Sequence, residues 1–113
     1  KGRDFEITNY YEGISRFNFN ELCNQNLGAE DYLEIVKNSK FIIVEKVPQF
    51  NDINFNQQLR FITLLDVIYD KGIPMAITAN QNLDEFTSSK SFKKEFKRTV
   101  SRLYELTSKK FDQ

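Results

Sequence analysis

Residues 41–79 read FIIVEKVPQFNDINFNQQLRFITLLDVIYDKGIPMAITA, and this stretch decides the fold class. The run Phe41-Ile42-Ile43-Val44 is short, apolar and rich in β-branched residues. It predicts a strand that is buried on both faces and ended by Val47-Pro48, because proline lacks the amide proton of the ladder. A second buried strand is predicted over residues 73–79. Because a helix separates them, we expect the two strands to be parallel and joined by a right-handed crossover.

The helix between these strands is expected from about Phe55 to Lys71. Asn51 and Asp52 are suitable N-cap residues, and Gly72 stands where a helix commonly ends in a left-handed residue. Apolar residues occupy nearly the whole circumference of this helix. We therefore expect it to be sandwiched between other elements rather than to lie on the surface.

Upstream, alternating apolar and polar residues predict two short antiparallel strands, around Phe5–Thr8 and Ile14–Phe19, joined by the loop Asn9–Gly13. A single helical turn capped by Asn20 is expected next. A helix over Ala29–Asn38 then follows, with an apolar stripe along one side.

Downstream, a last helix is predicted from Ser91 to about Ser108. The expected fold class is therefore α/β: a small mixed, partly parallel sheet flanked by helices, forming a single domain over residues 1–113. Its order is a β-hairpin, a helix, a β-α-β unit and a C-terminal helix. Helix and strand phase place one shared set of residues in the core: Leu59, Ile62, Leu65, Phe41, Ile43, Met75, Ile77, Phe96, Val100 and Leu103.

Composition narrows the class of protein. A chain of 113 residues fits one modest core, and its 16 basic and 16 acidic residues give a net charge of +0, so no overall attraction to nucleic acid or anionic lipid is expected. No apolar run approaches the roughly 20 residues of a spanning helix. The single cysteine, Cys23, indicates a reducing compartment. Because the chain begins at Lys1 rather than Met, we expect a domain cut from a longer protein.

Charge is unevenly distributed along the chain. Residues 90–113 hold six lysines and two arginines against two glutamates and one aspartate, a net charge of +5, so residues 1–89 carry −5. One interpretation is a C-terminal helix with a solvated basic face. The other is a contact surface for an acidic partner or for another part of the parent protein.

The sequence contains little of the chemistry that catalysis needs. It has no histidine and no GxxxxGK[ST] phosphate loop, so we expect no imidazole-based site and no ATP hydrolysis by this chain alone. Asp66 and Asp70 lie one helical turn apart and could hold a metal together, although solvation or pairing with arginine is the favoured interpretation. Cys23 has no evident base, so a buried thiol is expected. No catalytic, cofactor-binding or metal residue is assigned.

The candidate interaction or ion-pair residues are Arg60, Asp66, Arg98 and Arg102. Arg60 and Asp66 interrupt a strongly apolar helix, where an unpaired charge is costly. One interpretation is an internal network in which Arg98 or Arg102 pairs with Asp66 or Asp31. The other is that an arginine is presented to a nucleotide or a partner. We expect Arg102 to be structural, paired with Asp66 or Glu105, and Arg98 to stay available.

Four stretches together carry a family resemblance. They are FNFNELCNQNLGAEDYL (17–33), VP (47–48), RFITLLDVIYD (60–70) and FKRTVSRLYEL (96–106). In this order they resemble the C-terminal region of the Afg-type AAA+ ATPases, the ZapE-like cell division family. The resemblance runs from about Gly2-Arg3 to the end of the chain.

The resemblance implies an ATPase parent whose phosphate loop, magnesium motif and arginine finger lie upstream, so ATP and Mg²⁺ belong to the parent rather than to this fragment. It implies packing on that upstream core, with neighbouring subunits of an oligomer and a division-ring protein as further partners. A bacterial cytoplasmic location, peripheral at the inner membrane, would follow, and mitochondrial relatives are linked to protein quality control. Asn80, after the second strand, is similar to a sensor asparagine of such ATPases; a strand-to-loop turn is the alternative.

Two functions of other classes stay open. The first is an autonomous nucleic-acid-binding module that uses the basic C-terminal helix, which the overall charge balance does not favour. The second is a small enzyme that uses the carboxylates of Asp66 and Asp70, which would require a pocket containing both acids.

Overall fold

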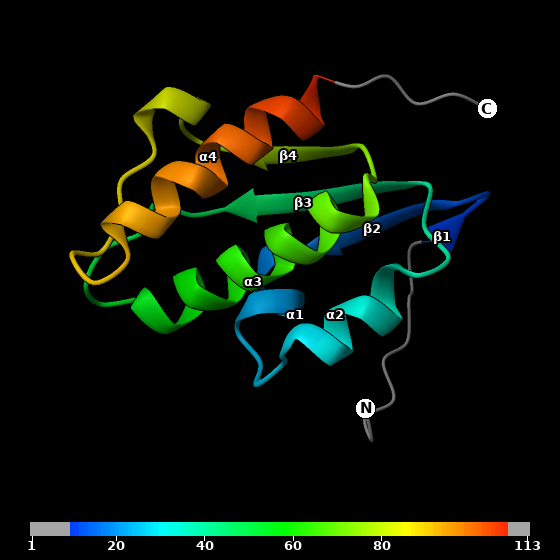
Figure 1. Cartoon of the computed structure of the whole chain (residues 1–113), viewed down its shortest axis with the longest axis horizontal. Coiled ribbons are helices and arrows are strands. Elements are labelled where there is room, and N and C mark those ends of the chain that lie inside the picture. Colours follow the sequence, from blue (N-terminus) through cyan, green and yellow to red (C-terminus); the bar gives the residue numbers. More distant parts are fainter. Residues whose placement is uncertain (1–9, 109–113) are drawn as a thin grey trace.

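A computed structural model describes residues 10–108 of the chain, and in it a four-stranded sheet supports a set of helices (Figure 1). The strands are β1 (Tyr10–Tyr11), β2 (Ile14–Asn18), β3 (Phe41–Val47) and β4 (Met75–Ala79). The helices are α1 (Phe19–Cys23), α2 (Ala29–Val36), α3 (Phe55–Lys71) and α4 (Lys93–Thr107), with a short 3-10 helix, η1 (Leu83–Glu85).

The strands follow one another across the sheet in the order β1-β2-β3-β4. β1 pairs antiparallel with β2, whereas β2, β3 and β4 run parallel. The expected mixed α/β class and the parallel pair of the β-α-β unit are therefore confirmed. The α1–α2 segment makes the first crossover between parallel strands, and α3 makes the second.

The helices form one layer against one face of the sheet. The molecule is 23 Å thick along its shortest axis, which matches one sheet and one helix layer. α3 lies between the α1–α2 pair and α4 and crosses the sheet (Figure 1). Neighbouring helices flank α3, but Phe55 and Leu59 on it are exposed, so the expectation that it does not lie on the surface is only partly met.

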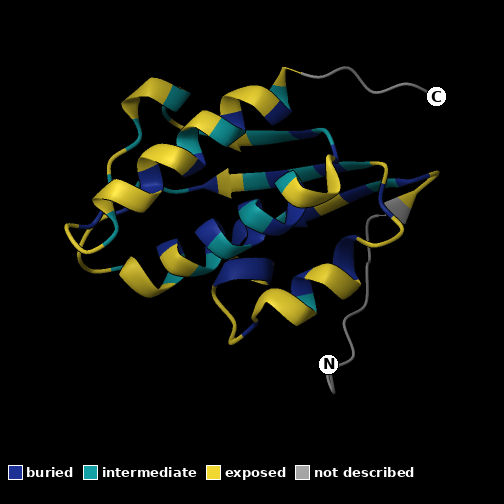
Figure 2. Cartoon of the chain, in the orientation of Figure 1, coloured by how far each residue is buried: buried dark blue, intermediate teal, exposed yellow. Residues whose placement is uncertain are grey.

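Burial alternates along β3, so the expectation of a strand buried on both faces is wrong. Ile42 and Val44 are fully buried under the helices, whereas Ile43 on the other face is half-buried. Figure 2 shows more than one burial class along this strand. An uninterrupted apolar run carries no alternation from which its inward face could be read.

Both ends of α3 lie at the expected residues. Gly72 adopts a left-handed conformation with φ of 67°, and the amide of Ile73 donates to the carbonyl of Ile68 at 3.2 Å, as in a Schellman motif. The N-cap is Asn54 rather than Asn51 or Asp52. Asn51 instead closes the turn before the helix, because its side chain accepts hydrogen bonds from the amides of Ile53 and Asn54.

The N-terminal hairpin is tighter than expected. Tyr10 and Tyr11 pair with β2, so only Glu12 and Gly13 remain of the predicted loop, and Gly13 adopts the positive φ of 89° that the turn requires. The strand predicted around Phe5–Thr8 lies outside the described residues.

Four other boundaries differ. α1 is capped by Asn18 rather than Asn20: its side chain accepts from the Asn20 amide while Glu21 accepts from the Asn18 amide, a capping box. α4 begins at Lys93 rather than at Ser91, and β4 begins at Met75 rather than at residue 73. α2 ends at Val36, short of the predicted Asn38.

The core lies between the sheet and the helices. Of the predicted set, Ile62, Leu65, Met75, Phe96 and Leu103 are buried, and Ile77 and Val100 are partly buried against the core. Three assignments are wrong. Leu59 is 44% exposed, and Phe41 and Ile43 belong to the strand face turned away from the buried Ile42 and Val44.

The phase of α3 predicts a sharp contrast between two leucines. Leu65 is fully buried, so Leu65→Ala should lower the free energy of unfolding by about 2–5 kcal/mol. Leu59→Ala removes the same atoms from an exposed position and should cost less than about 1 kcal/mol. Urea unfolding of both variants measures this, and a change for Leu65→Ala below about half a kcal/mol would contradict the burial of that helix face.

Candidate functional site

Three charged side chains meet along the seam between α3 and α4, and we call Asp66, Arg98 and Arg102 the arginine cluster. Nη1 of Arg102 lies 2.5 Å from Oδ1 of Asp66, whereas Nη2 of Arg98 lies 3.9 Å from Oδ2. Asp66 is on α3 and both arginines are on α4, one helical turn apart. The two helices are thereby joined through a single carboxylate.

Arg102 is the more enclosed of the two arginines. Its side chain is 23% exposed, and its guanidinium carbon lies 4.4 Å from the centroid of the Tyr69 ring, a cation–π arrangement. The Tyr69 hydroxyl donates to Oε1 of Glu105 at 2.9 Å. This hydrogen bond to a carboxylate raises the pKa of Tyr69. Of the two acids considered for Arg102, Asp66 is its hydrogen-bonding partner, and Glu105 is bonded to the neighbouring tyrosine.

Arg98 presents more of its side chain to solvent. It is 57% exposed, and its separation from Asp66 is too long for a hydrogen bond. A surface contact of this kind contributes little to stability. The guanidinium therefore keeps most of its donors for another molecule.

Arg60 has a different environment from the cluster. Its Nη1 donates to the carbonyl of Cys23, the last residue of α1, at 3.2 Å. A cation at the C-terminal end of a helix is favourably placed. Asp31, the other acid considered in the sequence, accepts a hydrogen bond from the Gly28 amide at the start of α2.

Cys23 is fully buried, as expected. Burial raises the pKa of its thiol to about 12, so the thiolate that a nucleophile requires does not form near neutral pH. The neighbouring Tyr32 is also fully buried, and its hydroxyl donates to the Leu22 carbonyl at 2.7 Å. Burial raises the pKa of Tyr32 as well. Both side chains are thus enclosed in the core of the fold.

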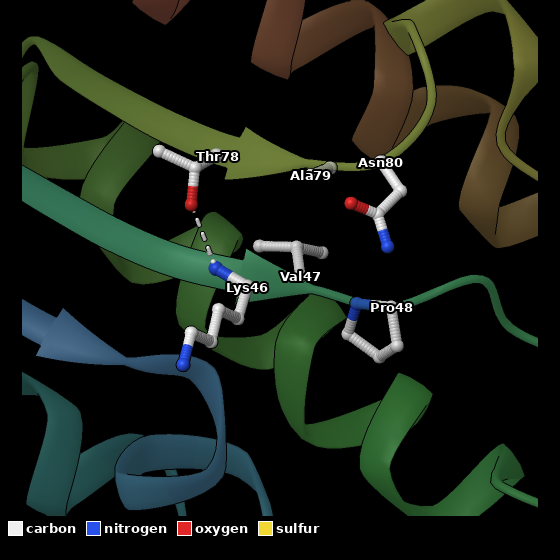
Figure 3. A pocket seen from close by; sticks show the side chains of 6 residues that line it. All are labelled: Lys46, Val47, Pro48, Thr78, Ala79 and Asn80. Atoms are coloured by element: carbon white, nitrogen blue, oxygen red, sulfur yellow. Dashed lines mark hydrogen bonds between the residues drawn. The ribbon is translucent and has the colours of Figure 1, made fainter.

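A pocket of about 390 Å³ lies at the carboxyl ends of β3 and β4, where parallel sheets commonly bind ligands (Figure 3). We call it the strand-edge pocket; its lining residues are Lys46, Val47, Pro48, Thr78, Ala79 and Asn80. Asn80 is exposed, and Figure 3 shows its amide beside Pro48, at one end of the pocket.

The rim of this pocket contains an irregular strand. Lys46 has a positive φ of 62°, which is uncommon for a residue other than glycine, and the register with β4 shifts between Val44 and Val47. The Lys46 amide donates to Oγ1 of Thr78 at 2.8 Å rather than continuing the ladder. The pocket offers hydrogen-bonding groups and one ammonium group, but no nucleophile with a base.

Nothing in the described residues assembles a metal site. No group of three or more cysteines, aspartates or glutamates among residues 10–108 is placed to hold a metal ion, and Asp66 is engaged by arginines. Within the same residues, no helix is both long and apolar enough to cross a bilayer.

Sequence reasoning missed a buried polar network around Gln58. This side chain is fully buried on α3; its amide nitrogen donates to Ser88 at 2.7 Å and its oxygen accepts from the Ser89 hydroxyl at 2.6 Å. A polar residue within an apolar helix was the available signal. Its partners lie 30 and 31 residues away along the chain, so the pattern could not identify them.

Comparison with known proteins gives one family. A family model described as AFG1-like ATPase matches residues 1–113. The chain is 36% identical over 84 residues to Lactation elevated protein 1 homolog B of Danio rerio, which is 74% of this chain and 17% of that protein. It is 27% identical over 93 residues to the Cell division protein ZapE of Escherichia coli (strain K12), which is 82% of this chain and 25% of that protein. The chain thus spans a quarter or less of the length of these curated relatives. No solved structure matches it.

The geometry of the arginine cluster predicts different effects for its two arginines. Arg102→Ala removes the close partner of a half-buried carboxylate and should lower the free energy of unfolding by about 1–3 kcal/mol. Arg98→Ala should change it by less than about 0.5 kcal/mol. Urea unfolding of the two variants beside the parent chain tests this, and equal midpoints for Arg102→Ala and the parent would refute a structural role for Arg102.

The buried thiol predicts a loss of stability in alkali. An exposed thiol in the unfolded chain ionises near pH 9, whereas that of Cys23 in the folded chain ionises near pH 12. Between these values the unfolded state therefore binds fewer protons than the folded state. The contribution of the protonated Cys23 thiol to the free energy of unfolding is intact below about pH 9. Above that it declines by at most about 1.4 kcal/mol per pH unit, up to pH 12. Unfolding at a series of pH values should show a shallower decline for Cys23→Ala than for the parent; parallel curves would contradict the raised pKa.

Proposed function

The chain belongs to the AFG1-like ATPase family, and on that premise we propose that it is the C-terminal domain of an Afg- and ZapE-like ATPase, packed on an upstream ATP-hydrolysing core. One observation carries the proposal. The family match covers the whole chain, yet the chain has no phosphate loop and spans a quarter or less of its relatives. Nucleotide chemistry then belongs to the rest of the polypeptide.

The residues of this chain do not fit a nucleotide or magnesium site of their own. The sequence lacks a glycine-rich phosphate loop, and residues 10–108 hold no cluster of metal ligands. In the proposed parent, ATP and Mg²⁺ are bound upstream. The upstream core packs on this domain as on a single folded unit.

The uncovered face of the sheet supports packing on another layer. Parallel sheets are usually covered on both faces, whereas the described helices of this chain cover one. On the other face, Ile14, Ile43 and Ala76 occupy neighbouring strands and are half-buried. These apolar side chains and the Arg16–Glu45 ion pair, which lies on the same face at 3.4 Å, form a surface on which the core of the parent can pack.

The exposed Arg98 supports a second role, contact with a neighbouring subunit or a target protein. Its guanidinium has donors to spare, and it lies on the strongly basic α4. One relative is named a cell division protein, and we propose a role in division if the host is a bacterium. The strand-edge pocket with Asn80 is available for the same kind of contact.

An ATPase assay distinguishes this chain from the proposed longer protein. We expect no Mg²⁺-dependent phosphate release by the 113-residue chain, because it lacks the phosphate loop. Turnover above that of a heat-treated sample would refute the proposal that the chemistry lies upstream.

The longer protein provides the complementary test. Arg98→Ala in that protein should weaken oligomer assembly or target binding by about fivefold or more, because a partner loses a charged hydrogen bond. Lys94→Ala, on the same helix but outside the cluster, should change it by less than twofold. Native mass measurement and pull-down of the target give the readout, and identical behaviour of the two variants would remove Arg98 from the interface.

A further inference from the structure

We propose that a groove between η1 and α4 binds an acidic amphipathic peptide segment, in which a large apolar side chain is flanked by aspartates or glutamates. This adds a second contact surface to the one proposed above, and it rests on that proposal only for the role of the domain as a contact module. The groove is separate from both the arginine cluster and the strand-edge pocket.

The groove has the size and the lining of a peptide-anchoring site. It encloses about 520 Å³, within the range typical of ligand pockets. Leu83 and Phe86 come from η1 and the residue after it, and Phe96 and Val100 come from one side of α4. These four apolar side chains can contact an aromatic or aliphatic anchor and remove it from water.

The rim of the groove is basic. Lys90, Lys93 and Lys97 line it and are exposed, and Lys93 and Lys97 are one turn apart on the same side of α4. No ion pair joins these three ammonium groups to an acid among the described residues. Asp84 is the single acid of the described lining, so the rim is net positive. A partner that adds carboxylates beside an apolar anchor matches this distribution.

The wall formed by residues 86–90 is already held in place. The Thr87 hydroxyl donates to the Phe50 carbonyl at 2.7 Å, and the Lys90 amide donates to Oδ1 of Asp52 at 2.8 Å. Between them, the Ser89 hydroxyl donates to the buried Gln58 at 2.6 Å. Because contacts with the core already order this segment, peptide binding does not carry the entropic cost of ordering it.

The apolar lining favours a peptide over a nucleic acid. Phosphate contacts would use the lysines but leave the apolar surface of Leu83, Phe86 and Val100 without an apolar partner. A peptide with an apolar anchor and flanking carboxylates uses both parts of the groove. In this proposal the excess positive charge in residues 90–113 serves to bind the carboxylates of the peptide, rather than only forming a solvent-exposed basic face.

Selection from a phage-displayed library of random peptides tests the specificity of the groove. We expect enriched sequences to combine a Phe, Leu or another large apolar residue with at least two carboxylates. A synthetic peptide of the enriched sequence should shift the backbone amide resonances of residues 83–100 in a ¹H–¹⁵N spectrum of the chain. Replacing its apolar anchor by alanine should abolish binding. Enrichment of basic sequences, or of none, would overturn the proposal.

Two double variants with the same change in net charge test the rim. Lys93→Gln/Lys97→Gln removes two lysines of the groove and should weaken binding of the selected peptide by roughly fivefold. Lys71→Gln/Lys94→Gln removes two exposed lysines outside it and should weaken binding by less than twofold. Both variants change surface residues, and urea unfolding confirms that they fold.

Equal loss in the two variants, or resonance shifts outside residues 83–100, would overturn the assignment to the groove. Displacement of the peptide by duplex DNA at physiological ionic strength would overturn it in favour of the nucleic-acid alternative. Peptide binding is measured on this chain without nucleotide and without an ATPase core. A negative result would therefore overturn the groove assignment but would not contradict the proposed packing on that core.

Discussion

The fold depends on the burial of α3. This helix connects β3 to β4, and Phe61, Leu64, Leu65 and Ile68 on it are fully inaccessible to solvent. Such burial requires neighbours on several sides, which the sheet, the α1–α2 pair and α4 provide. The Phe50 ring links these neighbours: its centroid lies 5.3–5.7 Å from those of Phe19, Phe61 and Phe96. Apolar burial around one helix thus fixes the positions of all the others.

The polar groups of α3 connect that core to the surface. Asp66 faces α4 and holds Arg102, Arg60 reaches the end of α1, and Gln58 binds the segment that leads into α4. Each of these groups would be costly in an apolar environment without its partner. The same contacts that satisfy them therefore tie α1 and α4 to the central helix. Arg98, at the outer side of the cluster, is left accessible.

This arrangement gives a small fold with a buried interior and several distinct surfaces. The uncovered sheet face carries half-buried apolar residues beside the Arg16–Glu45 ion pair, whereas α4 is basic and borders a groove with an apolar lining. The chain belongs to the AFG1-like ATPase family. In the function proposed above, this part of the parent contributes contacts through the arginines and lysines of α4.

The sequence by itself determined the α/β class, the β-α-β unit, the bounds of α3 and its glycine cap, because local periodicity and capping chemistry act within a few residues. It also singled out Asp66, as a charge in an apolar helix, and Arg98 and Arg102, because they share a face of the last helix. It could not give the inward face of β3, because a continuous apolar run has no alternation, nor could it show that Leu59 is exposed. The choice of Asp66 over Asp31 as the partner of Arg102, the Gln58 network and the groove beside α4 were decided only by the tertiary structure. Each of them joins residues about 30 or more positions apart in the chain or on different elements, and their distances follow from packing rather than from sequence spacing.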